Sequence, residues 1–339
     1  MALLLFMFTT NSALAQVQCP WQTYAQLPYT INNSQPALAV FQNQLYLAWI
    51  AAGVPSQIVV STSTDGVSWT SPVAVYTAST DLDIVKGYGG GVGMTSSDYC
   101  GQLYIGWRDS SFGMWVSRSA SGSSWSPKTY IFNFAQSAPA LRGDDSSLPI
   151  GWAFSAWWDP VQAYQVLTGK FNCDLSSPTF INCLFGDCSI ACQDQVEPRA
   201  PLWTGGGGVE FKAETRGTNS NPCFDISWYT TTSSGPWPLG GEWSDNGIAG
   251  AVDPSTGKAY LSWTCHDEGG NLGGDVCHPD GPPQSDINIG RADPSFSQKL
   301  TCTDWSLYNP AMTFFQGKLW LAWLGGGGGP VVASMQPPF

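Results

Sequence analysis

A short apolar segment that ends in tryptophan or a small residue recurs along the 339-residue chain. Its copies read LYLAW (45–49), LYIGW (103–107), LPIGW (148–152), VEFKA (209–213), AYLSW (259–263) and LWLAW (319–323). Each copy follows one apolar segment and precedes another, and a fourth is plainest in SPVAVY (71–76) and SPKTYIF (126–132). A single four-stranded sheet cannot bury both of its faces, whereas sheets packed face to face around an axis can. The repeat therefore predicts an all-β fold, a six-bladed β-propeller of four-stranded antiparallel blades.

The last unit ends at VVASMQPPF (331–339) and lacks a fourth segment. The segment WQTYAQLPYTINNSQPA (21–37) parallels WSPKTYIFNFAQSAPA (125–140), which spans the fourth segment of another unit. We therefore expect Trp21 to Tyr29 to supply the outer strand of the last blade and to close the ring. No linker interrupts the pattern, so residues 16–339 are predicted to form one domain.

The N-terminus has the pattern of a secretory signal peptide. Leu3 to Phe8 form a short apolar core, and Ala13-Leu14-Ala15 is a small-residue cleavage site, so we expect residues 1–15 to be removed. The chain is then secreted and extracellular.

An even number of cysteines, ten, favours disulfides in an exported chain over a zinc site, because only two histidines are present. Cys265 and Cys277 would close one loop, but the connectivity as a whole does not follow from the sequence.

Composition excludes several partners. The net charge is −12 with only 13 lysines and arginines, and no basic cluster is present, which argues against nucleic acid and against anionic membranes. No later segment reaches the roughly 20 apolar residues of a transmembrane helix. Charged residues are only 11% of the chain and glycine is abundant (38 residues), as expected of short strands joined by many turns.

The turn Ser63-Thr64-Asp65-Gly66-Val67-Ser68-Trp69 resembles an Asp-box, the turn between the third and fourth strands of blades in the sialidase superfamily. SASGSSW (119–125) resembles a second copy, with Ser121 in the place of the aspartate. Asp65 can accept hydrogen bonds from its own turn, Gly66 allows a positive φ, and Trp69 can pack back over the hairpin. Ser63, Asp65, Gly66 and Trp69 are therefore predicted to be structural.

The resemblance implies a sialidase-like site on the opposite face, built by loops before first strands and after second strands. Tyr308 stands where the family's nucleophilic tyrosine stands, and Glu197 stands where its assisting glutamate stands. Arg216 lies within a residue or two of one family arginine. These matches make Tyr308 and Glu197 the candidate catalytic residues.

The rest of the sialidase set is missing. Arginines expected in NSQPA (33–37) and in PPQS (282–285) are absent, and IAAGVPS (50–56) contains no carboxylate for the acid/base. Bidentate guanidinium groups hold the carboxylate of sialic acid, so their loss argues against sialidase activity. The predicted ligand-binding set is Arg216, Arg199, Arg108, Asp109 and Asp245.

Two further sites are predicted. Asp267, Glu268 and Asp275 lie in an acidic loop between His266 and His278 and could ligate Ca²⁺, although a loop closed by a disulfide explains them too. No other cofactor is expected. Asn32 begins an Asn-Asn-Ser glycosylation sequon on the expected ligand face.

Three functional interpretations follow. We expect a non-catalytic protein that binds extracellular glycans or surfaces. A structural protein that self-associates into filaments, or a glycoside hydrolase with an altered site, are the alternatives.

Overall fold

The computed structural model describes residues 19–32, 34–86, 90–133, 135, 137–143, 150–158, 163–183, 202–203, 209–218, 221–230, 237–243, 248–265, 285–291 and 298–339. Within these residues the chain forms strands and no helix. The strands are β1 (Thr23–Gln26), β2 (Ala37–Phe41), β3 (Gln44–Ala51), β4 (Gln57–Ser63), β5 (Val73–Thr77), β6 (Val92–Ser97), β7 (Gln102–Arg108), β8 (Met114–Ser119), β9 (Thr129–Phe132), β10 (Ala140–Arg142), β11 (Ile150–Trp158), β12 (Ala163–Phe171), β13 (Thr179–Cys183), β14 (Leu202–Trp203), β15 (Val209–Thr218), β16 (Asn221–Thr230), β17 (Trp237–Trp243), β18 (Ile248–Val252), β19 (Ala259–Cys265), β20 (Ser285–Arg291), β21 (Lys299–Ser306), β22 (Ala311–Phe315), β23 (Lys318–Leu324) and β24 (Pro330–Met335).

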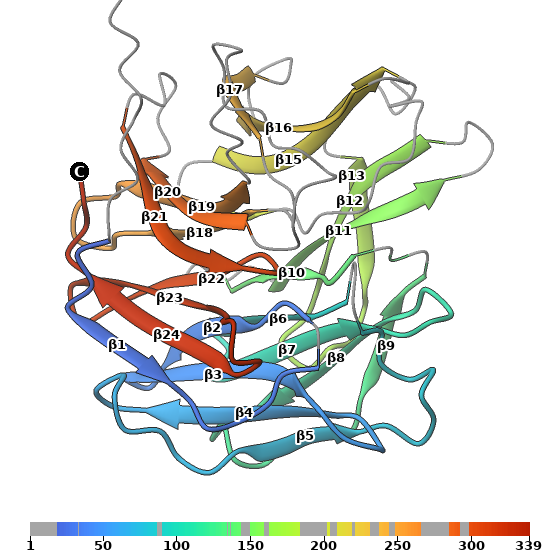
Figure 1. Cartoon of the computed structure of the whole chain (residues 1–339). Coiled ribbons are helices and arrows are strands. Elements are labelled where there is room, and N and C mark those ends of the chain that lie inside the picture. Colours follow the sequence, from blue (N-terminus) through green and yellow to red (C-terminus); the bar gives the residue numbers. More distant parts are fainter. Residues whose placement is uncertain are drawn as a thin grey trace, which may run out of the picture.

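In the part of the chain that the structure describes, these strands form six four-stranded antiparallel sheets (Figure 1). Five sheets use consecutive strands, β2–β5, β6–β9, β10–β13, β14–β17 and β18–β21, and the sixth has the order β1-β24-β23-β22. The first strand of each sheet contacts the first strands of the sheets on either side, so the sheets surround a common axis. The predicted all-β propeller architecture is confirmed.

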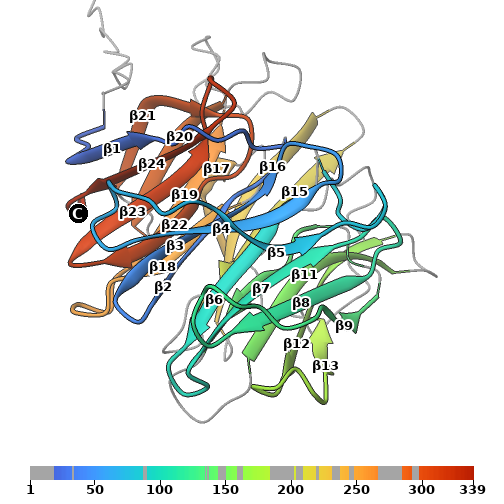
Figure 2. The same ribbon diagram turned by 90° about the horizontal axis from the view of Figure 1, so that it is seen from below.

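Closure of the ring is non-local. Strand β1 pairs antiparallel with β24, with Thr23 opposite Ser334, and Figures 1 and 2 show these two strands side by side. Cys19 forms a disulfide with Cys302 in β21, across 283 residues of sequence. The Trp21 indole donates a 2.6 Å hydrogen bond to Asp304, also in β21. The expected outer strand is therefore present, and it is fastened to the preceding sheet as well as to its own.

The repeated tryptophan at the end of the second strand packs between sheets. Trp107 in β7 is fully buried and stacks on Tyr76 in β5 of the preceding sheet, with ring centroids 5.2 Å apart. Trp49 in β3 stacks in the same way on Tyr29 of the N-terminal segment, at 5.5 Å. The same position in β19 and β23 is also a buried tryptophan. This explains the sequence repeat, because each sheet needs a large apolar surface to cover its neighbour.

A second aromatic position packs in the opposite direction. Tyr104 in β7 contacts Phe171 in β12 of the following sheet, with ring centroids 6.0 Å apart. Tyr260 in β19 contacts Phe314 in β22 of the following sheet, at 5.6 Å. The second sheet therefore contacts both of its neighbours through aromatic side chains three residues apart on β7.

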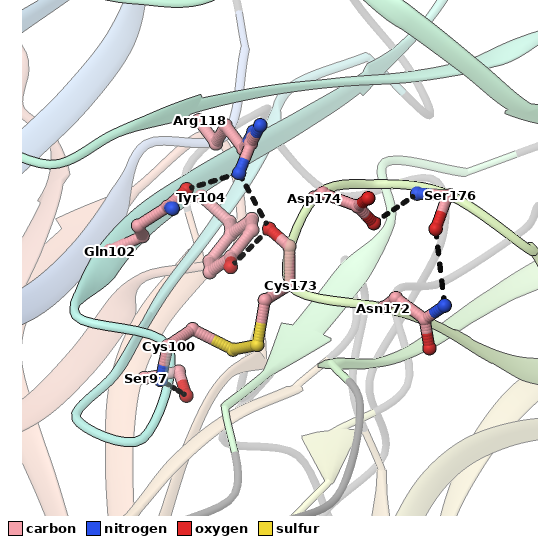
Figure 3. The surroundings of a disulfide bond; sticks show 9 residues. All are labelled: Ser97, Cys100, Gln102, Tyr104, Arg118, Asn172, Cys173, Asp174 and Ser176. Atoms are coloured by element: carbon pink, nitrogen blue, oxygen red, sulfur yellow. Dashed lines mark hydrogen bonds between the residues drawn. A yellow bond between two sulfur atoms is a disulfide. The ribbon is translucent and has the colours of Figure 1, made fainter.

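The loops divide between two faces of the ring. We call the face at which first strands begin the proximal face, and the face at which they end the distal face. A disulfide between Cys100 and Cys173 joins the second and third sheets on the distal face, and the Cys173 carbonyl accepts hydrogen bonds from Tyr104 and Arg118 (Figure 3). Gly325–Gly329, predicted as a turn, connects β23 to β24 on the proximal face.

Two further findings bear on the predicted location. The described residues include no helix that is long and apolar enough to cross a membrane. Two disulfides are compatible with an extracellular protein. The predicted signal peptide and Cys277 lie outside the described residues.

Replacing Cys19 and Cys302 together by serine should lower the free energy of unfolding. Their disulfide closes a loop of 283 residues in the unfolded chain and so restricts its conformational entropy strongly. The chain-entropy model gives up to about 5–6 kcal/mol for a loop of this length. Urea unfolding without reductant measures it. The matched control is Cys100→Ser with Cys173→Ser, which opens a loop of 73 residues and should cost about 1 kcal/mol less. A larger loss in the control would contradict the role of Cys19–Cys302 as the main clasp.

Candidate functional site

The first strands surround an axial cavity of about 300 Å³. It is lined from five of the sheets, by Gln35, Pro36 and β2, by Val92 to Ser96 of β6, by Pro139 and β10, by Ile248 to Gly250 of β18, and by Ala311 to Thr313 of β22. A cavity of this size lies at the lower end of the range for small-ligand sites. The expected ligand face, built by loops before first strands, lies at the proximal end of this cavity.

Tyr308 lies on the proximal face, three residues before β22, and its side chain is not among those that line the cavity. Its backbone N–H donates to Ser306 Oγ at 3.2 Å, and its carbonyl accepts from the same hydroxyl at 2.6 Å, which fixes the loop. The side chain is half-buried against an apolar cluster that includes Ile31 and Trp49. Burial raises the pKa of Tyr308 above its ordinary value. The phenol is therefore protonated at neutral pH, and it needs a neighbouring base to act as a nucleophile.

Asn309 is a residue that sequence reasoning missed. Its side chain is 1% exposed, and neither its amide nitrogen nor its amide oxygen has a hydrogen-bond partner. Ala37 pairs with Ala48 as Ala311 pairs with Ala322, so Asn309 corresponds to Gln35 of the first sheet. In the sequence it is marked only by its place before Pro310-Ala311, as Gln35 stands before Pro36-Ala37. Buried amides normally have partners, so Asn309 marks a polar position beside Tyr308.

The predicted pair Arg108 and Asp109 ends β7 on the proximal face. Arg108 is 8% exposed, and burial lowers its pKa to about 10, which leaves it charged at neutral pH. Asp109 accepts hydrogen bonds from the Gly113 backbone at 2.8 Å and from the Trp115 indole at 2.7 Å, one at each carboxylate oxygen. The structure therefore uses Asp109 to organise the loop 109–113.

The Asp65 turn lies on the distal face and has the predicted local geometry. Asp65 Oδ1 accepts hydrogen bonds from the backbone of Val67 and Ser68, each at 2.8 Å, and from Ser63 Oγ at 2.9 Å. The Trp69 indole donates to the Gly66 carbonyl at 3.0 Å. These bonds to the ionised form lower the pKa of Asp65 to about 2.

Gly66 and Gly122 explain why these turns face the neighbouring sheet. Gly66 has φ of 74°, and a Cβ there would overlap the Trp320 ring of the preceding sheet. Gly122 has φ of 72°, and a Cβ there would overlap the Tyr46 ring. The Ser121 hydroxyl makes a 3.0 Å contact with the Ser123 hydroxyl and accepts a 3.4 Å bond from the Ser123 backbone, and the Ser121 N–H donates to Ser119 Oγ at 3.2 Å. Both turns are inter-sheet contacts that glycine permits.

Several predicted site residues lie outside the described residues. They are Glu197, Arg199, Asp245, Asp267, Glu268 and Asp275. Arg216 is placed in β15 opposite Cys223, by its backbone alone. Asn32 is partly exposed on the proximal face, and its backbone donates to the Ile50 carbonyl at 2.8 Å. Among the described residues, no group of three or more His, Cys, Asp or Glu side chains could hold a metal ion.

Comparison with known proteins gives matches only at the level of structure. No protein-family model and no curated protein matches the sequence. An α-L-arabinofuranosidase from Fusarium graminearum, bound to an iminosugar inhibitor, superposes with a TM-score of 0.60 over 93% of this chain and 98% of its own, at 11% identity. An α-L-arabinanase from Penicillium chrysogenum, bound to arabinobiose, has a TM-score of 0.56, 12% identity and the same coverage of both chains.

These matches show a propeller fold of the kind found in glycoside hydrolases. They correct the expectation of a non-catalytic glycan-binding protein, because both of these structures, which match over 93% of this chain, are hydrolases. The expectation of a non-catalytic protein rested on the missing sialidase arginines. That argument bears on a carboxylated substrate and not on glycoside cleavage in general.

The Asp65 carboxylate should contribute stability that depends on pH. Its folded pKa lies below the unfolded value of about 3.9, so the contribution is present above pH 4 and is lost as the pH falls through about 2. Asp65→Ala should lower the melting temperature by about 2 °C at pH 7 and by less at pH 2.5. Differential scanning calorimetry at the two pH values measures this.

Ser121→Asp is the matched gain-of-function variant, since it restores the missing carboxylate in the second turn. It should raise the melting temperature at pH 7 by a similar amount. An unchanged melting temperature in both variants would contradict a stabilising role for these turns.

Proposed function

We propose that this chain is an exported glycoside hydrolase that cleaves a neutral glycan at the proximal end of the axial cavity. In this proposal each of the six sheets is one blade of a six-bladed propeller that is similar to those of the sialidase superfamily. The superposition on an arabinofuranosidase over nearly the full length of both chains is the observation that carries the proposal. The axial cavity and the half-buried Tyr308 on the proximal face support it.

Charge favours a neutral sugar over an acidic one. The arginines that would clamp a carboxylate are absent from 33–37 and 282–285, and the chain carries a net charge of −12. A protein of this charge repels polyanionic glycans at long range. The two hydrolases described above are named for arabinofuranosides and arabinan, which contain no carboxylate. We therefore propose α-L-arabinofuranosyl linkages as the first substrate class.

The catalytic groups follow from the chemistry of glycoside cleavage, which needs a proton donor and a nucleophile or base. Asp109 is held by Gly113 and Trp115. Of the carboxylates predicted on this face, Glu197 and Asp245 are then the candidates for proton transfer. Tyr308, whose pKa is raised by burial, acts as a nucleophile only if Glu197 removes its proton.

Hydrolysis tests the proposal directly. The protein should release 4-nitrophenol from the α-L-arabinofuranoside, or arabinose from arabinan, and should not release sialic acid from its 4-methylumbelliferyl glycoside. Tyr308→Phe and Glu197→Gln should each lower kcat/KM by about a hundredfold or more. Tyr99→Phe, an exposed distal-face tyrosine, is the matched control and should change kcat/KM by less than about twofold.

Two results would overturn the proposal. One is the absence of hydrolysis on any neutral glycoside or polysaccharide by the folded protein. The other is activity that Tyr308→Phe and Glu197→Gln both leave at the level of the Tyr99→Phe control.

A further inference from the structure

The loop 109–113 presents an aromatic ring to solvent from an unusual backbone conformation. Phe112 has φ of 65°, and its side chain is 41% exposed. A bulky residue in the left-handed region is an outlier, and such outliers persist where the surrounding structure holds them. Because a glycine would adopt this conformation without strain, the phenylalanine at this position needs an explanation other than the turn itself.

Hydrogen bonds fix this loop at several points. The Phe112 backbone donates to the Asp109 carbonyl at 3.1 Å, and Asp109 N–H donates to the Gly113 carbonyl at 2.9 Å. The Asp109 carboxylate then joins the Gly113 backbone to the Trp115 indole. The backbone that carries the ring is therefore fixed before any ligand arrives, which lowers the entropy lost on binding.

Neighbouring segments anchor the loop from both sides. Ala135 N–H donates to the Phe112 carbonyl at 2.9 Å, from the connection to the third sheet. On the other side Ser110 donates to the Leu82 carbonyl through its backbone at 2.9 Å and through its hydroxyl at 3.0 Å. Leu82 is itself 64% exposed. Two exposed apolar side chains thus stand on adjacent, hydrogen-bonded proximal loops.

The loop lies on the same face as the candidate active site. It connects β7 to β8. Trp107, near the end of β7, lies opposite Val92 of β6, and Val92 lines the axial cavity. Tyr308 lies on the same proximal face, just before the first strand of the sixth sheet. A ligand that extends outward from the cavity across the second sheet would pass this loop.

We propose that Phe112, with Leu82 beside it, is a stacking subsite for a sugar ring of a neutral glycan chain, away from the bond that is cleaved. This inference rests on the proposed function and names a chain rather than a single sugar as the substrate. An aromatic ring face and a neighbouring apolar side chain match the apolar face of a sugar, and neither carries charge. One ring and one leucine are also far smaller than the roughly 800 Å² that each partner contributes to a stable protein interface.

The variants separate the ring from the backbone. Phe112→Ala and Phe112→Gly both remove the ring, but Phe112→Gly also relieves the left-handed conformation, so its melting temperature should equal or exceed that of the unchanged protein. Phe112→Tyr keeps a stacking face. Tyr99→Ala removes an exposed aromatic ring from the distal face and serves as the control.

Affinity electrophoresis in gels that contain linear arabinan measures binding without reference to hydrolysis. Phe112→Ala and Phe112→Gly should raise the dissociation constant by about tenfold, while Phe112→Tyr and Tyr99→Ala should leave it within about twofold. In hydrolysis, KM for arabinan should rise in the same two variants, with kcat/KM for the aryl monosaccharide unchanged.

Equal retardation of all variants, or no retardation of the unchanged protein, would overturn the subsite. Changed sedimentation in Phe112→Ala would also overturn it, by showing that a second copy covers the ring. A protein that binds arabinan through Phe112 and hydrolyses nothing would instead refute the proposed function and leave the subsite standing.

Discussion

Aromatic packing between neighbouring sheets is the interaction on which the rest of this structure depends. Trp107 stacks on Tyr76 of the sheet before it, and Tyr104, three residues earlier on the same strand, packs on Phe171 of the sheet after it. A four-stranded sheet has two apolar faces, and only a closed ring covers both on every sheet. Closure therefore cannot be local. Strand β1 completes the sixth sheet by pairing with β24, and the Cys19–Cys302 disulfide links this N-terminal segment to β21 of the fifth sheet.

This arrangement separates stability from chemistry by face. The distal face holds the Asp65 turn, whose Gly66 packs on Trp320 of the preceding sheet, and the Cys100–Cys173 disulfide, which joins two sheets. The proximal face holds Tyr308, the buried amide of Asn309 and the preformed Phe112 loop. Loops on this second face can change without loosening the ring. A hydrolase site for a neutral sugar could thus occupy the place where sialidases hold a charged one.

The fold was largely predictable because the repeat is a packing signal. The repeated second strands, the outer strand supplied by Trp21 to Tyr29 and the hydrogen bonds of Asp65 all follow from residue pattern and turn chemistry. Asn309 and Phe112 were not predicted, since their significance lies in a missing partner and in a backbone angle, and neither is visible in sequence. Asp109 was predicted to bind a ligand, and the structure shows its carboxylate accepting hydrogen bonds within its own loop. The sequence alone does not distinguish these two roles of an aspartate that follows a strand.

The function was predicted less well, for a chemical reason. Missing arginines exclude a carboxylate clamp, and the sequence argument extended that exclusion to catalysis as a whole. Glycoside cleavage requires only a proton donor and a nucleophile or base, and the sequence retains candidates for both. A crystal structure with a bound arabino-oligosaccharide is the most direct test of the central claim. We expect a sugar at the proximal end of the axial cavity, in contact with Tyr308. Electron density for the sugar only on the distal face, or only on the outer strands, would contradict it.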